Sequence, residues 1–157
     1  MKKICIALDY SPTSREVVET GYEYARALGA SVSLVHVISD ASYYTSGHDA
    51  YMGYDGFNMI NSVNLVDDLK TSSQQYLSTV AGNLGNSDID TAVIEGAVST
   101  SILEYATTWG ADLLVLGTHG RNFLENMLMG NTAVDIVKNS SIPLLVIPVK
   151  KEEKEKR

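Results

Sequence analysis

Cysteine and proline are scarce in this sequence of 157 residues, which contains one cysteine and three prolines. A disulfide within the chain needs two cysteines, so Cys5 forms none, and its apolar neighbours indicate an inert thiol in a buried strand. No apolar run approaches the ~20 residues that span a bilayer. The apolar run after Lys2 and Lys3 ends at Asp9, too early for a signal peptide. We therefore expect a cytoplasmic protein of one domain, not a membrane protein.

Positive charge is also scarce. The chain has 12 lysines and arginines against 19 aspartates and glutamates, a net charge of −7. A nucleic-acid-binding protein generally needs a basic face, so this balance argues against that class of partner. Many of the cations lie in residues 150–157, which are all charged and have nothing to bury. We expect a folded domain over 1–149 and a disordered tail over 150–157.

The rest of the chain alternates short apolar runs with segments of helical periodicity, which predicts an α/β domain with a mostly parallel sheet. Ser11 and Pro12 are typical of a helix N-cap and first helical position, and Gly29 of a helix end. The predicted strands cover residues 3–9, 31–38, 90–94, 112–116 and 143–149. The predicted helices cover residues 12–28, 63–84, 99–108 (capped by Ser99) and 132–139.

Three glycines follow the fourth predicted strand. Gly117 and Gly120 come directly after its apolar residues, and Gly130 comes just before a predicted helix. Glycines there let the backbone approach a bound anion, and the free N–H groups of the helix's first turn would point at it. A polyphosphate would fit such a site. The alternative is that the glycines only form turns, and the spacing alone does not decide between the two.

Catalytic groups are missing from this segment. No Gly-Lys-Ser or Gly-Lys-Thr occurs, so the segment is not a Walker A loop, and no lysine lies within 117–132. Asp112 begins the fourth strand, which places it badly for holding Mg²⁺ at the strand's other end. No positioned general base for attacking water is evident. We therefore expect no enzyme, and slow ATP hydrolysis at most.

The glycine spacing G-x2-G-x9-G after a fourth strand resembles the ATP-binding type of the universal stress protein family. Four more blocks agree with that family: the first strand ending at Asp9, the Val-His-Val of 35–37, and the stretches 95–121 and 141–149. The resemblance covers residues 2–149, apart mainly from 40–62. One position departs from the pattern. Many nucleotide-binding members have Ser or Thr directly after the third glycine, where this chain has Asn131 and then Thr132.

This resemblance implies a Rossmann-like fold, an open five-stranded sheet of order 3-2-1-4-5 with helices on both faces. Ligands of such sheets bind where the strand order reverses, which is between strands 1 and 4. The implied function is a stress-response regulator that binds ATP or a related adenine nucleotide, with or without Mg²⁺, and has no resident metal site. The residues expected at the nucleotide are Ala7, Leu8, Asp9, Val37, Leu116, Gly117, His119, Gly120, Arg121, Gly130, Asn131 and Thr132.

Several of these residues have a second interpretation. Asp9 would accept hydrogen bonds from the ribose, but a carboxylate at a strand end also caps the following helix. Arg121 would pair with a phosphate or lie free on the surface. His119 would contribute its backbone rather than its ring. Asn131 is a good helix N-cap and can also donate to a phosphate oxygen.

The last strand indicates a homodimer. Leu144, Val146 and Ile147 lie in an apolar strand that the implied order places at a sheet edge, where an unpaired strand is an aggregation hazard. The resemblance implies antiparallel pairing with a second copy, which Pro143 and Pro148 would restrict to the residues between them. A monomer whose edge is shielded by the charged tail is the alternative. The rival functions are a dimeric interaction module without nucleotide and, third, an ATP-using enzyme of the adenylyl-transferring kind.

The segment 40–61 is rich in tyrosine, glycine and aspartate and is long for a loop, so we expect a lid over the crevice or a partner surface. His48, Asp49 and Asp55 lack the spacing of metal ligands, and we expect no metal there. We interpret His36 as a structural residue of the second strand and Trp109 as packing at a helix end.

Overall fold

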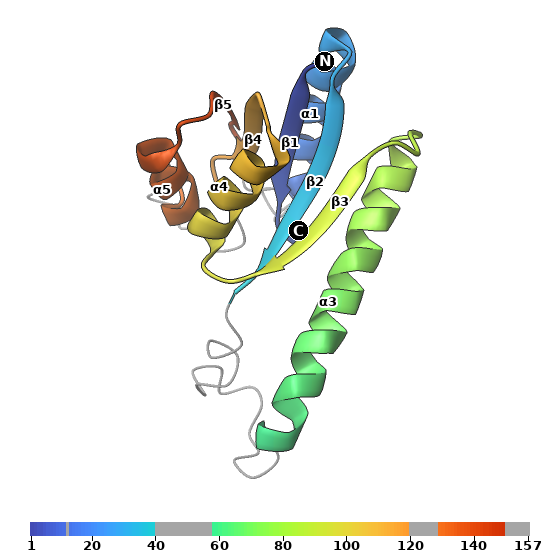
Figure 1. The fold of residues 1–157 in the computed structure, drawn as a ribbon, viewed down its shortest axis with the longest axis vertical. Coiled ribbons are helices and arrows are strands. Elements are labelled where there is room, and N and C mark those ends of the chain that lie inside the picture. The colour runs from blue at the N-terminus through green and yellow to red at the C-terminus, as the bar shows by residue number, and fades with distance from the viewer. Residues whose placement is uncertain (12, 40–57, 120–128, 150–157) are drawn as a thin grey trace, which may run out of the picture.

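Five parallel strands form one sheet in the computed structural model, which describes residues 1–11, 13–39, 58–119 and 129–149 (Figure 1). The strand order is β3-β2-β1-β4-β5, as expected. The elements in chain order are β1 (Lys3–Leu8), α1 (Ser14–Leu28), β2 (Ser31–Ile38), α3 (Asn58–Asn83), β3 (Asp90–Glu95), α4 (Val98–Trp109), β4 (Leu113–Gly117), α5 (Asn131–Asn139) and β5 (Leu144–Ile147). The tyrosine-rich segment and the charged tail lie outside the described residues.

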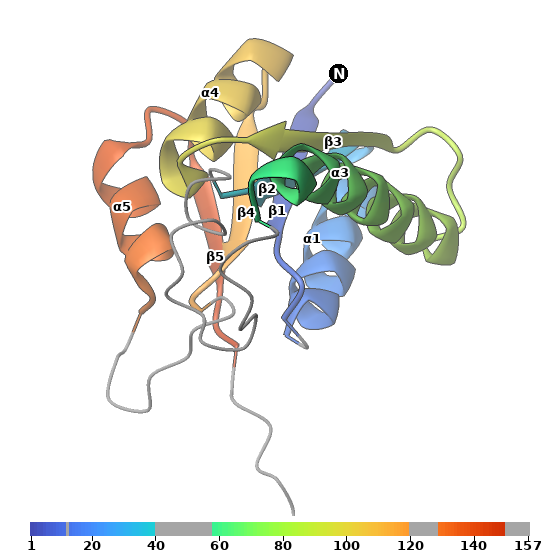
Figure 2. The same ribbon diagram turned by 90° about the horizontal axis from the view of Figure 1, so that it is seen from below.

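Side-chain alternation along the strands divides the core between the two faces of the sheet. Ile4 and Ile6 of β1 pack in one cluster with residues of α1 and α3, such as Val17 and Leu77. Cys5, between them, packs on the opposite face with residues of α4 and α5, such as Ile136. Figure 2 shows α1 and α3 on one side of the sheet and α4 and α5 on the other.

Cys5 is the central residue of β1 and has no exposed surface. Its strand pairs with β2 on one side and β4 on the other, so the thiol is enclosed within the sheet and the helices that cover it. Burial raises the pKa of Cys5 to about 12, which keeps the sulfur protonated. The expectation that Cys5 lies in the core is confirmed.

The chain order reverses between β1 and β4. From β1 the chain winds outward to β2 and β3, then returns through α4 to place β4 against the other side of β1. Ile6 pairs with Val115 in this register. Extending the register by three residues on both strands brings Asp9 level with Thr118. The predicted meeting point of the first and fourth strand ends therefore exists in the fold.

All four predicted helix starts differ from the observed ones, by one to five residues. Helix α1 begins at Ser14 after Thr13, and the Ser14 amide donates to the Ser11 carbonyl in the turn before the helix. Helix α4 begins at Val98, and Ala97 rather than Ser99 occupies its N-cap position. Helix α3 begins five residues earlier than expected, β2 has the predicted bounds, and ends of the other strands are shifted by one or two residues.

Gly29 ends α1 as predicted. It adopts a left-handed conformation with φ 59°, and its amide donates to carbonyls of the helix's last turn. A residue with a Cβ rarely adopts this φ, which is why glycine closes the helix. The chain then enters β2 within two residues.

Candidate functional site

Asp9 follows β1 at the carboxyl edge of the sheet and is partly buried. One carboxylate oxygen, Oδ1, accepts hydrogen bonds from the Ser11 amide at 2.9 Å and from the Ser14 hydroxyl at 2.7 Å. The other oxygen, Oδ2, has no hydrogen-bond partner among the described residues, and no partnerless buried polar atom occurs there. Oδ2 is therefore accessible to solvent. The carboxylate is fixed by one oxygen and offers the other to a donor from outside.

The backbone at the end of β1 is held by three side chains from three different elements. The Leu8 carbonyl lies 2.9 Å from His36 Nδ1 of β2, and because a carbonyl only accepts, Nδ1 carries the proton. The Asp9 carbonyl accepts from the Ser14 hydroxyl of α1 at 2.6 Å and from the Tyr76 hydroxyl of α3 at 3.2 Å. These contacts fix the position of the Asp9 backbone, from which the carboxylate extends.

Burial changes the proton affinities of two of these groups. It lowers the pKa of His36 below the usual 6.5, although the Leu8 carbonyl and the Asp9 charge act in the opposite direction. It raises the pKa of the Tyr76 hydroxyl above 10.0. Near neutral pH the histidine ring is therefore neutral and the tyrosine hydroxyl is a donor.

Thr118 joins the ends of three elements at β4. Its amide donates to the Ile147 carbonyl of β5 at 2.9 Å, and its hydroxyl accepts from the Val149 amide at 3.1 Å. Its carbonyl accepts from the Gly130 amide at 2.7 Å, directly before α5. Thr118 thus fixes the start of α5 beside the end of β4.

No side chain of the described residues caps the start of helix α5. Gly130 occupies the N-cap position, and its carbonyl accepts the first helical hydrogen bond from the Val134 amide at 3.0 Å. The expectation that Asn131 caps this helix is wrong: Asn131 is the first helical residue, and both it and Thr132 are exposed. The amides of the first turn are therefore left for an external acceptor.

Gly117 has a packing reason to be glycine. A Cβ at this position would lie 2.9 Å from the Val17 Cγ2 of α1, which is closer than side chains normally approach. Packing of the last residue of β4 against α1 therefore explains this glycine, and a ligand is not needed to explain it. Gly130 is different, because its φ of −70° and ψ of 159° are open to any residue.

The structure brings most of the predicted site residues to one edge, with exceptions. Ala7, Val37 and Leu116 pack on the face of α4 and α5. Leu8 packs on the opposite face of the sheet, with α1 and α3, so only its backbone lies between the two faces. His119 is buried, and its Nδ1 lies 3.1 Å from the Thr118 hydroxyl. The predicted residues Gly120 and Arg121 lie outside the described part of the chain.

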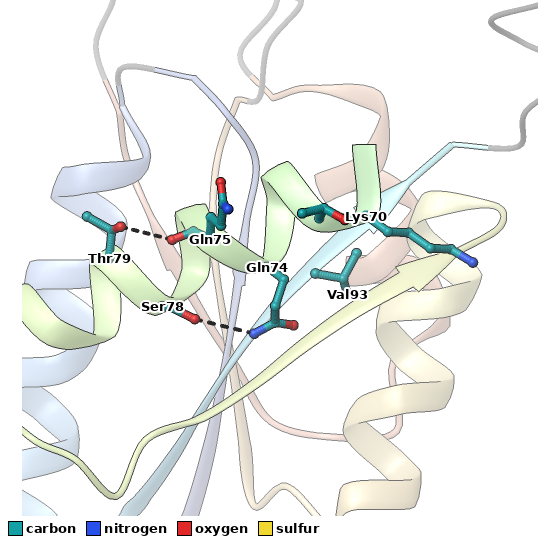
Figure 3. Close-up of a pocket in the computed structure, with 7 residues that line it drawn as sticks. Lys70, Gln74, Gln75, Ser78, Thr79 and Val93 are labelled. Carbon is teal, nitrogen blue, oxygen red and sulfur yellow. Dashed lines mark hydrogen bonds between the residues drawn. The ribbon is translucent and has the colours of Figure 1, made fainter. Parts of the chain in front are cut away.

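Two surface hollows in the described structure lie away from the ends of β1 and β4. One lies between α3 and Val93 of β3, and its other lining residues include Gln74, Ser78 and Lys70, which pairs with Glu95 at 3.3 Å (Figure 3). The other lies between the last turns of α4 and α5. No predicted site residue lines either hollow.

The described residues include no helix with the length and apolarity needed to cross a membrane. They also include no group of three histidine, cysteine, aspartate or glutamate side chains arranged to hold a metal ion. His48, Asp49 and Asp55 lie outside the described residues.

The fold and this edge can be compared with known proteins. The family model described as "Universal stress protein family" matches residues 1–148. The chain belongs to the universal stress protein family. A relative of this universal stress protein in Methanocaldococcus jannaschii, itself named a universal stress protein, is 32% identical over 155 residues, covering 97% of this chain and 85% of the relative.

Solved structures agree with the fold of this universal stress protein. The hypothetical protein MJ0577 superposes with a TM-score of 0.76 at 20% identity, covering 96% of this chain and 98% of the other. A universal stress protein in complex with cAMP has a TM-score of 0.61 at 19% identity, over 93% and 95% of the two chains. One from Archaeoglobus fulgidus in complex with dAMP has a TM-score of 0.60 at 17% identity, over 96% and 98%.

Proposed function

We propose that this universal stress protein binds ATP or a related adenine nucleotide at the carboxyl edge of the sheet, between β1 and β4, and acts as a cytoplasmic regulator in a stress response. The observation that carries the proposal is the pairing of two unsatisfied features across the switch point. The accessible Oδ2 of Asp9 follows β1. The uncapped N-terminus of α5 is held against the end of β4 by Thr118.

The two features have complementary chemistry toward a nucleotide. A carboxylate oxygen accepts hydrogen bonds from ribose hydroxyls, whereas the first-turn amides of a helix donate to phosphate oxygens. Ala7, Val37 and Leu116 lie on one face of the same edge and offer an apolar surface to a base. The crystallised family members with cAMP and dAMP support an adenine nucleotide as the ligand class.

A binding role fits the residues better than catalysis. Asp112 lies at the amino edge, where its Oδ2 accepts from the Lys3 amide at 2.9 Å, far from the nucleotide edge. No lysine lies between Gly117 and Thr132 in the sequence. Phosphoryl transfer needs a catalytic cation and a positioned base at the phosphates, and the described site residues include neither a lysine nor an evident base.

We also propose a homodimer formed through β5. This strand is at the sheet edge, and Leu144 and Val146 are only half-buried in the single chain. Pro143 and Pro148 flank the strand and cannot donate to a ladder, so pairing would be confined to Leu144–Ile147. Antiparallel pairing with a second copy would close the assembly at two chains.

The test of nucleotide binding uses thermal unfolding with and without millimolar ATP, with Mg²⁺ as a variable. A ligand at ~100 times its Kd stabilises the fold by ~2.7 kcal/mol, which moves the melting temperature by several degrees. No shift under either condition would rule out binding of useful affinity.

Asn131→Asp separates an effect on nucleotide binding from an effect on folding. A negative charge in the first turn favours α5 itself but repels phosphate, so the free protein keeps or raises its melting temperature while the shift with ATP shrinks. Gly130→Val adds bulk at a backbone conformation that valine adopts without strain, and it should also abolish the shift. Unchanged ATP binding in both variants would place the phosphates elsewhere.

A further inference from the structure

An aromatic and hydroxyl cluster joins α3 to the turn that carries Asp9. The Tyr10 hydroxyl donates to the hydroxyl of Ser73, a fully buried residue of α3. The Tyr10 ring lies 4.6 Å from the His36 ring and 4.8 Å from the Tyr76 ring, measured between centroids. Tyr76, three residues after Ser73 on the same face of α3, donates to the Asp9 carbonyl at 3.2 Å.

The contacts concentrate on two consecutive residues. Asp9 is bonded at both its carbonyl and its carboxylate, and the carbonyl takes donors from α1 and α3 together. Tyr10 is 42% exposed, yet its ring contacts His36 of β2 and Tyr76 of α3, and its hydroxyl contacts Ser73 of α3. The turn is therefore held between α1 and α3, and α3 cannot shift along the sheet without disturbing the Asp9 backbone.

We propose that Tyr76 is a positioning residue for the Asp9 carboxylate. We also propose that Tyr76 and Tyr10 couple ligand binding at the nucleotide site to the position of α3 on the sheet. The inference rests on the proposed function, because it assigns a role to Asp9 at a ligand. Tyr76 acts through Asp9 and does not itself touch the nucleotide. When a ligand donates a hydrogen bond to Oδ2, the turn that carries Asp9 becomes more rigid. Helix α3, which is bonded to that turn, becomes more rigid with it.

The coupling follows from shared hydrogen bonds. If Tyr76 and the ligand both favour the same position of the Asp9 turn, each stabilises the state that the other needs, and the effect is reciprocal. Removing the Tyr76 hydroxyl should then weaken nucleotide binding although the hydroxyl is not in the site. A purely structural hydrogen bond would change the melting temperature without this effect on affinity.

The experiment compares Tyr76→Phe with wild type and with the control Tyr105→Phe. Tyr105 likewise has a burial-raised pKa and a hydroxyl bond, to Ser33 at 2.7 Å, but it lies on the α4 side of the sheet. We expect Tyr76→Phe to bind ATP about threefold to tenfold more weakly, the effect of one hydrogen bond, and Tyr105→Phe to bind as wild type.

A double-mutant cycle assigns the effect to Asp9. In an Asp9→Asn background, Tyr76→Phe should cause no further loss of affinity, because the group that it positions has been changed. Equal losses in both backgrounds, or no loss in either, would overturn the proposal. Amide exchange of α3 around residues 73–77 should slow on ATP binding in wild type and respond less in Tyr76→Phe.

A ligand-free measurement distinguishes failure of this inference from failure of nucleotide binding. The Ser11 amide donates to Asp9 Oδ1, so its hydrogen-exchange rate reports how firmly the carboxylate is held. Tyr76→Phe should raise that rate severalfold in the absence of ligand, and Tyr105→Phe should not. If wild type binds no nucleotide but this rate rises, the ligand class is wrong and the positioning role stands; an unchanged rate overturns the positioning role itself.

Discussion

The two carboxylate oxygens of Asp9 have different surroundings, and one substitution separates them. In Asp9→Asn the amide oxygen can still accept from Ser11 and Ser14, while the accessible acceptor becomes a donor. We expect the free energy of unfolding to change by less than ~1 kcal/mol and nucleotide affinity to fall roughly tenfold. Calorimetric titration with ATP, alongside urea unfolding, measures both.

Ser14→Ala is the matched control for Asp9→Asn, because it removes a hydrogen-bond donor to Asp9 and leaves the carboxylate itself unchanged. It removes the hydroxyl that donates to both the carbonyl and the carboxylate of Asp9, so it should destabilise the turn by ~1–2 kcal/mol. If Asp9 only caps the α1 turn, Asp9→Asn will leave ATP affinity unchanged. That result would favour the second interpretation of the residue.

His36 gives the fold a specific dependence on pH. Its pKa in the folded protein is lowered by burial, so the unfolded chain binds the proton more readily. Its contribution to stability is complete above 6.5, the pKa of an ordinary histidine, and is lost as the pH falls toward the lower folded value. We expect the free energy of unfolding to decrease between pH 7.5 and 5.5, measured by urea titration.

The matched variant is His36→Asn, which keeps a donor but does not titrate. Its decrease over the same interval should be smaller than that of wild type, since other groups alone remain to titrate. Parallel curves for the two proteins would mean that His36 does not carry the pH dependence.

At the level of elements, the strands were predicted far better than the helix starts. Apolar runs such as those of β2 and β4 are short, buried and bounded by polar or glycine residues, so periodicity locates them to within a residue. The start of α1 was missed because Ser11 is engaged by Asp9 and Ser14 in a turn that precedes the helix. Whether the local turn or the helix cap forms depends on three-dimensional geometry, which the spacing of residues in the sequence does not specify.

The same division applies to the site. The position of Asp9 and of the start of α5 at the carboxyl edge could be predicted, because a strand end and a glycine before a helix are recognisable in the sequence. Tyr76, which contacts Asp9, and Ser73, which contacts Tyr10, were missed, since each lies more than sixty residues after its partner and meets it only through the tertiary fold. Leu8 was assigned to the base, but strand alternation places its side chain on the other face, which a parity count along β1 would have shown.

The proposed dimer is a property of β5. Val146→Lys introduces a long charged side chain in the middle of the edge strand, where pairing with a second copy would require a close neighbour. We expect wild type to scatter light as a dimer and the variant as a monomer of 17.0 kDa at micromolar concentration.

Circular dichroism of the same samples provides the control, because Val146 also contacts the core beside α4 and α5. The variant must retain a cooperative melting transition for its monomeric state to be informative. A wild-type monomer would contradict the proposed dimer, and a dimeric variant would place the interface on another surface.

For the whole molecule, the proposed role is binding without efficient turnover. Steady ATP hydrolysis should stay well below ~1 s⁻¹, the lower end of the usual enzyme range, because the segment 117–132 has no lysine and no base is evident for the transferred phosphoryl group. Phosphate release by protein that has been purified to constant specific activity measures it. Faster turnover that disappears in Gly130→Val would make the protein an enzyme.

Because the thiol of Cys5 is enclosed, its rate of chemical labelling measures complete unfolding of the protein. Because the sulfur lies inside the sheet and stays protonated, an alkylating reagent reaches it only in molecules whose sheet has opened. When reclosing is fast relative to labelling, the labelling rate is proportional to the opened population. Any compound that binds only the closed form slows the reaction by the factor 1 + [L]/Kd, about 100-fold at ~100 times Kd. Candidate nucleotides can therefore be ranked by how strongly they protect one sulfur atom, with no label added to the protein.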